Sequence, residues 1–125
     1  MELKDAVVVI GDDSVLARKQ LKDVLLGLGV GTVFEAANGK LAAELVAKEK
    51  PNLVFLDIVM PVMDGNSAIE TILASDPDMK IVVVSSVGTQ AQVKRAVEAG
   101  IKDFIQKPFN TDQIAKTVKT LIEEA

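Results

Sequence analysis

The sequence of 125 residues contains no cysteine and no histidine. Without cysteine the chain can form neither a disulfide nor a thiolate nucleophile, which fits a reducing compartment. Without histidine it has no imidazole metal ligand, no Ser-His triad and no histidine general base. Any chemistry of this chain must therefore rest on carboxylates, hydroxyls and amines.

Long apolar runs and clusters of basic residues are also missing. No run approaches the roughly 18 to 20 apolar residues that cross a bilayer, and residues 1–5 contain no apolar signal core. The formal net charge is −4, and the Lys and Arg residues are scattered along the chain. This distribution argues against direct contact with nucleic acid. We therefore expect a cytoplasmic protein without membrane insertion.

The composition that remains is that of a globular protein. Hydrophobic residues make up 49% and charged residues 26% of the chain, which is enough apolar material for a sizeable core. No linker, internal repeat or low-complexity segment divides the sequence. We therefore expect a single domain over residues 1–125.

Short apolar runs alternate with longer amphipathic segments, and three of the runs are rich in Val and Ile, as buried parallel strands are. Between the runs, apolar residues recur with the period of a helix. The expected strands are residues 6–10, 32–36, 52–56, 80–84 and 101–106. Five strands that alternate with five helices predict an α/β fold, (βα)₅, whose parallel sheet is covered on both sides.

Turn and cap residues agree with these boundaries. Asn38-Gly39 precedes the second helical pattern, and Gly100 stands where the fourth helix should end. Asn110 precedes Gln113 by three residues, which is the spacing of a capping box. These signals predict where three of the helix termini lie.

Polar side chains follow four of the five expected strands. They are Asp12, Asp13 and Ser14 after the first strand, Asp57 after the third, Ser85 and Ser86 after the fourth, and Lys107 and Pro108 after the fifth. Ligands bind beyond the carboxyl ends of the strands in an open parallel sheet. These residues are therefore expected to converge on one cleft.

Three carboxylates in one cleft would repel one another, and a bound cation relieves that repulsion. A hard divalent ion such as Mg²⁺ prefers oxygen ligands. With the ion and Lys107 present, the cleft suits a phosphoryl group, which a carboxylate can accept as an aspartyl phosphate. Asp57 is the best-placed nucleophile because it stands alone after the most apolar strand, whereas Asp12 and Asp13 are adjacent and suit a metal.

Each of these signals also has a plainer structural interpretation. Asp12-Asp13-Ser14 is typical of a helix N-terminus, and Asp57 of a turn at a strand end. Ser85 can be an ordinary hydrogen-bonded hydroxyl, and Lys107 a solvated lysine. The coincidence of these residue types at four strand ends is what favours a phosphoryl site.

Together the residues resemble the receiver domain of two-component response regulators over essentially the whole chain. The matching pieces are Asp12-Asp13, the segment 56–65 around Asp57, Ser85, and Lys107-Pro108-Phe109. The resemblance implies a flavodoxin-like, doubly wound sheet in the strand order 2-1-3-4-5. It implies a signalling switch whose Asp57 is phosphorylated by a sensor histidine kinase or a histidine phosphotransfer protein, and no other enzymatic activity.

The resemblance also implies roles for single residues. Asp13, Asp57 and the backbone carbonyl of Val59 would bind Mg²⁺, and Asp12 would act partly through water. Lys107 would contact the phosphoryl oxygens. The hydroxyl of Ser85 would move toward the phosphoryl group.

Three further positions complete the switch that the resemblance implies. Phe104 would rotate inward when Ser85 moves, and the Lys107–Pro108 bond would be cis, as cis bonds are largely confined to proline. Val59 and Val87 stand at positions that tune the lifetime of the phosphoryl group. Both are apolar here and cannot orient a water, so we expect slow self-hydrolysis.

The output face implied by the resemblance is the fourth helix, the fifth strand and the fifth helix, where a downstream protein would bind. The residues expected to be exposed there are Gln92, Lys94, Arg95, Lys102 and Gln106. A free-standing receiver favours chemotaxis or a phosphorelay. Gly11 departs from the aliphatic residue that is usual before the acidic pair, and we expect it to loosen the first loop.

Alternative interpretations differ in their chemistry. A phosphatase of the haloacid dehalogenase type also forms an aspartyl phosphate, but it usually carries a second Asp two residues later, where this chain has Val59. A receiver-like module that works without phosphorylation is disfavoured by the complete set of Asp, Ser and Lys residues. The chain can also be a receiver cut from a longer regulator, although it ends at the fifth helix without a linker.

Overall fold

The strands and helices alternate along the chain as the sequence predicts. The computed structural model describes residues 1–86 and 89–124. Its strands are β1 (Val7–Gly11), β2 (Thr32–Ala36), β3 (Leu53–Leu56), β4 (Ile81–Ser85) and β5 (Asp103–Gln106). Its helices are α1 (Val15–Leu28), α2 (Gly39–Glu49), α3 (Gly65–Ser75), α4 (Gln90–Ala99) and α5 (Thr111–Val118).

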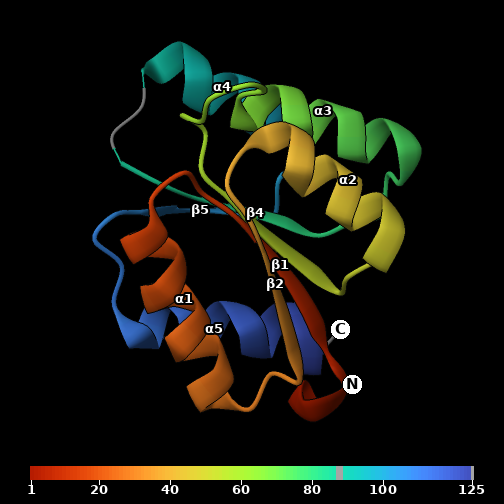
Figure 1. The fold of residues 1–125 in the computed structure, drawn as a ribbon, viewed down its shortest axis with the longest axis vertical. Coiled ribbons are helices and arrows are strands. Elements are labelled where there is room, and N and C mark those ends of the chain that lie inside the picture. The colour runs from red at the N-terminus through yellow and green to blue at the C-terminus, as the bar shows by residue number, and fades with distance from the viewer. Residues whose placement is uncertain (87–88, 125) are drawn as a thin grey trace.

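The five strands form one parallel sheet in the order β2-β1-β3-β4-β5, which confirms the predicted topology. Helices α1 and α5 cover one face of the sheet, and α2, α3 and α4 cover the other (Figure 1). Because all strands run in the same direction, the ends of β1, β3, β4 and β5 lie at one edge of the sheet. This edge carries the candidate site.

Apolar side chains fill both spaces between the sheet and its helices. Val8 and Val9 of β1 alternate between the two layers: Val8 packs with α1 and α5, and Val9 packs with α2 and α3. Every residue of β3 and β4 is buried. A strand covered on both faces is apolar at nearly every position, which explains why β3 and the first four residues of β4 are continuous apolar runs in the sequence.

Side-chain caps set the beginnings of the helices. Asn38 caps α2, and Asn110 with Gln113 forms the predicted capping box of α5. Thr89 and Gln92 form a second capping box, at α4. Gly100 ends α4 with φ 110, a left-handed conformation that glycine adopts without strain.

The ends of the chain add two short segments that periodicity does not predict. A 3₁₀ turn, η1 (Leu3–Asp5), precedes β1, and a π-helical turn, η2 (Lys119–Glu123), continues α5. Within the described ranges no helix is long and apolar enough to span a membrane. The longest helix, α1, has 14 residues.

Candidate functional site

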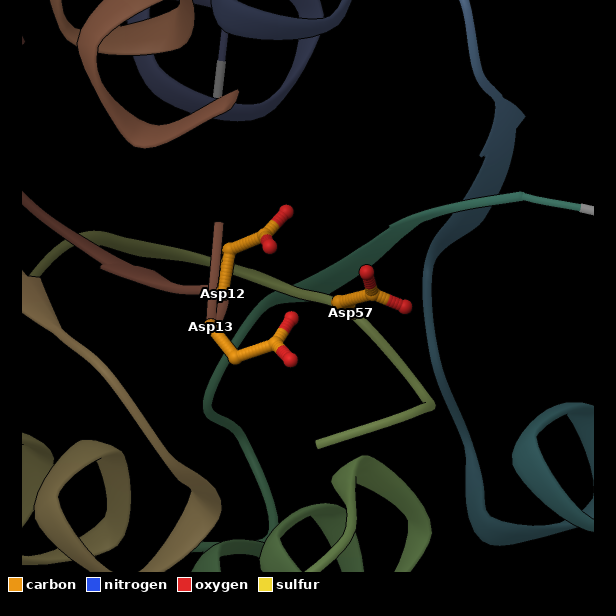
Figure 2. Close-up of side chains that lie close together, drawn as sticks. All are labelled: Asp12, Asp13 and Asp57. Atoms are coloured by element: carbon orange, nitrogen blue, oxygen red, sulfur yellow. The ribbon is translucent and has the colours of Figure 1, made fainter. Parts of the chain in front are cut away.

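Three carboxylates meet at the edge of the sheet where β1 and β3 end. Asp12 and Asp13 follow β1 and Asp57 follows β3, and Figure 2 shows the three side chains beside one another. One carboxylate oxygen from each lies within 4.8 Å of the others. Asp12 and Asp57 are 5% and 7% exposed, whereas Asp13 is exposed. The convergence predicted for these residues is confirmed.

Lys107, which follows β5, joins two of these carboxylates. Its Nζ lies 2.5 Å from Asp12 Oδ2 and 2.9 Å from Asp57 Oδ2. Burial by itself would lower the pKa of Lys107, but the hydrogen bonds to Asp12 and Asp57 outweigh burial and raise it above its ordinary value. Lys107 is therefore a cation at neutral pH and offsets one of three negative charges.

Two other donors hold the second oxygen of Asp57. The hydroxyl of Ser85, at the end of β4, donates to Asp57 Oδ1 at 2.5 Å, and the amide of Val59 donates to the same atom at 3.1 Å. Ser85 is 1% exposed. Each oxygen of the Asp57 carboxylate thus faces a side-chain donor from a different strand end.

The loop that carries the acidic pair is fastened by a residue that sequence reasoning missed. The Arg18 Nη1 in the first turn of α1 donates to the carbonyl oxygen of Asp12 at 2.6 Å, and Arg18 Nε lies 3.3 Å from Glu35 Oε1 on β2. The amide of Ser14 donates to Asp12 Oδ1 at 2.9 Å. No motif signals the role of Arg18, because it depends on how α1 packs beside the loop.

Glycine is required at two positions around the site. A Cβ on Gly65 would lie 2.0 Å from the carbonyl oxygen of Asp57, so the first turn of α3 packs directly on the backbone of Asp57. A Cβ on Gly11 would lie 2.5 Å from Leu56 Cδ2. The expectation that Gly11 loosens the first loop is wrong, because Gly11 is a buried residue of β1 and Leu56 fills the space beside it.

A cleft of about 550 Å³ opens over these side chains. Its walls include the three carboxylates, Ser85, Ser86, Lys107 and Val59. The Val59 side chain is 61% exposed. Asp57 is therefore buried at the bottom of an open cleft, where a small group can reach its carboxylate.

The donor set of the cleft fits a hard divalent cation. Three carboxylates supply oxygen ligands of the kind that Mg²⁺ prefers. Lys107 pairs with Asp12 and Asp57, and among the described residues no cation pairs with Asp13. Lys107 balances only part of the negative charge of the three carboxylates, and the remaining charge attracts a cation.

Two of the three further positions that the resemblance links to a switch, Phe104 and Pro108, lie within the described residues. Phe104 on β5 is half-buried and packs against the core between the sheet and helices α2, α3 and α4. The Lys107–Pro108 bond is cis, as expected. Val87, for which the sequence suggests a role in phosphoryl lifetime, lies outside the described residues.

Three of the five residues expected to be exposed on the output face make side-chain contacts: Gln92, Arg95 and Lys94, whose Nζ lies 3.8 Å from Glu98 Oε1. Lys94, Lys102 and Gln106 are exposed. Gln92 is half-buried, and its side chain is held in the capping box of α4. Arg95 is exposed, but its guanidinium makes two hydrogen bonds to Glu70 of α3 and is not free for a partner.

Comparisons with known proteins agree with this geometry. The family model described as the response regulator receiver domain matches residues 8–119. The chemotaxis protein CheY of Thermotoga maritima is 42% identical over 111 residues, which cover 89% of this chain and 92% of that protein. CheY of Bacillus subtilis is 41% identical, with 91% and 96% covered.

Solved structures give the same result. A chain in the crystal structure of the CheX-CheY-BeF₃-Mg²⁺ complex from Borrelia burgdorferi is 31% identical, with a TM-score of 0.86 and with 92% of this chain and 87% of that chain covered. A CheY-like receiver domain protein from Methanospirillum hungatei is 25% identical with a TM-score of 0.89, and 95% and 94% of the two chains are covered.

Proposed function

The chain belongs to the response regulator receiver domain family, and from this premise we propose that it is a signalling switch that accepts a phosphoryl group on Asp57. The observation that carries the proposal is the setting of the Asp57 carboxylate. Ser85 lies at one oxygen and Lys107 at the other, beside two further carboxylates. Among the described residues, neither Asp12 nor Asp13 has both a hydroxyl and an ammonium group from two other strand ends.

In the proposed reaction an Asp57 carboxylate oxygen attacks the phosphorus atom of a phosphohistidine on a partner protein. The O–P bond forms as the P–N bond breaks, and the imidazole leaves and takes up a proton. The chain has no histidine, so the donor is a separate kinase or phosphotransfer protein. A small acyl phosphate supplies the same group with a carboxylate as the leaving group. Such transfer depends mainly on positioning and on charge neutralisation.

Mg²⁺ is the proposed cofactor, held by Asp12, Asp13 and Asp57 with the backbone carbonyl of Val59. When bound, the ion neutralises charge that gathers on the phosphoryl oxygens. Residues of the chain position the acceptor and the phosphoryl group. Lys107 is already 2.9 Å from Asp57 Oδ2, so it is placed to pair with a phosphoryl oxygen. The Ser85 hydroxyl and the Val59 amide hold the other oxygen of Asp57.

The proposed switch begins at Ser85. Its hydroxyl now donates to Asp57 Oδ1, and a phosphoryl group offers it a stronger, charged acceptor. The move of Ser85 would leave room on the inner side of Phe104, which is only half-buried and can rotate inward. The phosphoryl group would thereby bias a two-state equilibrium in the protein.

The proposed output face lies on α4, β5 and α5. A groove of about 440 Å³ runs between β5 and α5, and Lys102, Phe104 and Lys116 are among the residues that line it. A downstream protein would sense Phe104 there.

The similarity to CheY proteins supports chemotaxis as the pathway, and we place the protein in the cytoplasm.

The proposed site is tested by incubation with acetyl phosphate and Mg²⁺ followed by intact-mass spectrometry. The unmodified protein should gain about 80 Da, and Asp57→Asn should gain nothing. Asp78→Asn is the matched control, because Asp78 is exposed and precedes β4, at the end of the strand opposite to the cleft. Undiminished labelling of Asp57→Asn would show that Asp57 is not the acceptor.

A related variant separates acceptance from signalling. Lys107→Ala should still accept the label, because the nucleophile remains, but it should bind its downstream partner poorly after labelling.

We further propose that the protein does not turn over phosphate esters, since Val59 stands where a phosphatase would carry its acid. Steady release of product from a generic phosphate ester would contradict that part of the proposal.

A further inference from the structure

Helix α4 is held mainly by polar contacts. Of its residues, all of which the structure describes, only Ala96 is fully buried, whereas α3 buries five residues. Two polar contacts join α4 to α3 instead. Asn66 Nδ2 donates to the carbonyl oxygen of Gln92 at 3.1 Å, and Arg95 binds Glu70 at 2.9 and 2.5 Å. A helix with so little buried apolar surface can shift at low cost.

Asn66 also stands next to the acceptor. The amide of Gly65 donates to the carbonyl oxygen of Ile58 at 2.7 Å, and the Gly65 Cα packs against the carbonyl oxygen of Asp57. Asn66 is the next residue along α3, and its side chain crosses to the first turn of α4. A short series of direct contacts therefore runs from Asp57 through Gly65 and Asn66 to Gln92.

The amide oxygen of Asn66 is unsatisfied. Asn66 is 3% exposed, and its Oδ1 has no hydrogen-bond partner within residues 1–86 and 89–124. The two ends of the amide cannot exchange places, because the partner of Nδ2 is a carbonyl oxygen, which only accepts. A buried acceptor without a donor costs more than one neutral hydrogen bond gains. In this conformation the hydrogen bond of Asn66 Nδ2 therefore does not offset the free-energy cost of burying Oδ1 without a donor.

The first turn of α4 carries donors that would satisfy this oxygen. In the capping box, the Thr89 side-chain oxygen accepts from the Gln92 amide, and the Gln92 side-chain oxygen accepts from the Thr89 amide. The Thr89 hydroxyl hydrogen and the Gln92 side-chain NH₂ group have no acceptor among the described residues. Because Asn66 Nδ2 already binds the carbonyl oxygen of Gln92, both donors belong to the turn that the Asn66 side chain reaches, and a movement of this turn relative to α3 can bring one of them to Asn66 Oδ1.

We propose that Asn66 is a positioning residue of the switch, whose Oδ1 gains a donor from the first turn of α4 when Asp57 carries a phosphoryl group. Asn66 then stabilises the phosphorylated conformation relative to the present one, and it links the acceptor to α4 along α3, separately from Ser85 and Phe104. This inference rests on the proposed phosphorylation of Asp57.

Beryllofluoride with Mg²⁺ is the probe, because BeF₃⁻ imitates a phosphoryl group on a carboxylate. The chain has no Trp and no Tyr, so binding is measured by isothermal titration calorimetry. Asn66→Leu and Asn66→Ala both remove the unsatisfied oxygen. Each variant should bind BeF₃⁻ about tenfold more weakly than the unmodified protein, a change of about 1.4 kcal/mol. Without BeF₃⁻, at least Asn66→Leu should unfold at an equal or higher temperature.

The combination of weaker BeF₃⁻ binding with undiminished thermal stability separates positioning from a merely structural role. Ser67→Ala is the matched control, because Ser67 is the next residue of α3 and no hydrogen bond of its side chain is found among the described residues; it should bind BeF₃⁻ like the unmodified protein. Affinities of both Asn66 variants within twofold of the unmodified protein, or tighter, would overturn the role of Asn66. Failure of the unmodified protein to bind BeF₃⁻ would instead overturn the phosphoryl site.

Discussion

At Asp57 the donors that hold the carboxylate are the ones that a phosphoryl group would need. Ser85 and the Val59 amide lie at Oδ1, and Lys107 lies at Oδ2. Hydrogen bonds from a cation or a hydroxyl to a phosphoryl oxygen are charge-assisted and strong. The same donors can therefore be used before and after phosphorylation, and the change proposed at the carboxylate itself is a movement of Ser85 toward the phosphoryl group.

The raised pKa of Lys107 predicts a stability effect at high pH. Burial acts to lower this pKa, but the hydrogen bonds to Asp12 and Asp57 raise it above the ordinary 10.5. The folded protein then holds the proton more tightly than the unfolded chain does. The contribution of Lys107 is therefore complete below pH 10.5 and is lost as the pH rises through the higher folded value.

Urea unfolding of the unmodified protein and of Lys107→Met measures this contribution. The difference in the free energy of unfolding between the two should be constant from about pH 7 to 9.5 and should shrink above about pH 10.5. The comparison cancels the titration of the other lysines. A difference that instead shrinks between pH 7 and 9 would mean that the carboxylates do not raise the pKa of Lys107.

The exposed valine at the cleft predicts a long phosphoryl lifetime. Val59 lines the cleft over Asp57 and cannot orient a water for attack on phosphorus. Val59→Asn should therefore accelerate loss of the label several-fold, by placing a polar group where a water can be held. The measurement is the decay of labelled protein by intact mass after the donor is removed. An unchanged decay rate would refute this role, and Val87→Glu is the parallel test of the prediction made for Val87.

Residue types and their order in the sequence were enough to predict which side chains meet. Asp12, Asp57, Ser85 and Lys107 each follow a strand, and parallel strands bring their ends together. The sequence does not reveal that Lys107 bridges Asp12 and Asp57, since that depends on the reach of one side chain. Arg18 was missed for the same reason.

At the scale of elements, α3 is placed by a glycine. The first turn of α3 touches the backbone of Asp57 so closely that a methyl group on Gly65 does not fit. Gly27 in α1 is a contrasting case, because a Cβ there would meet nothing within 4 Å. Packing therefore requires glycine at position 65, whereas at position 27 only the intrinsic helix preference of the residue matters.

Alanine substitutions at these glycines should therefore have opposite effects. Gly27→Ala should stabilise the protein by about 0.5–1 kcal/mol, because alanine loses less backbone entropy in a helix. Gly65→Ala should destabilise it by about 1–3 kcal/mol, as overpacking does, and should slow labelling of Asp57. Urea denaturation and acetyl phosphate labelling measure the two effects. Equal stabilities of the two variants would contradict the close approach of α3 to Asp57.

The strands were predicted within one or two residues, and the helices were predicted between them, because buried strands and amphipathic helices leave different periods in the sequence. The capping box at Asn110 was predicted from its spacing, whereas that at Thr89 was not. Exposure on α4 was partly mispredicted. The contacts of Gln92 and Arg95 are made with α3 or within the cap, and a helical pattern does not indicate which neighbour occupies its polar side.

On the scale of the whole molecule, the candidate site joins segments that are far apart in the chain. Lys107 binds partners 95 and 50 residues away, so the cleft forms only when the whole sheet has formed. A ligand that binds this cleft therefore binds the folded protein and not the unfolded chain. Ligand binding and global stability must be linked.

Magnesium should accordingly stabilise the entire fold. Three carboxylates face one another with only Lys107 to offset them among the described residues, and a bound cation would relieve the remaining repulsion. At a concentration one hundred times the dissociation constant, a ligand adds about 2.7 kcal/mol. For a domain of this size that is an increase of about 10 °C in Tm.

Thermal unfolding followed by circular dichroism, in EDTA and in saturating Mg²⁺, tests this linkage. The unmodified protein should show the full increase in Tm, and Asp13→Asn should show a much smaller one because it loses a proposed ligand. In EDTA the order should reverse, with Asp13→Asn at least as stable as the unmodified protein, since one of the three repelling charges is gone. Asp78→Asn, which removes a charge at the opposite end of β4 from the cleft, should behave like the unmodified protein. Equal shifts in the unmodified protein and in Asp13→Asn would mean that the ion binds elsewhere, because a cation held by this cleft would lose one of its proposed ligands in Asp13→Asn and would bind more weakly.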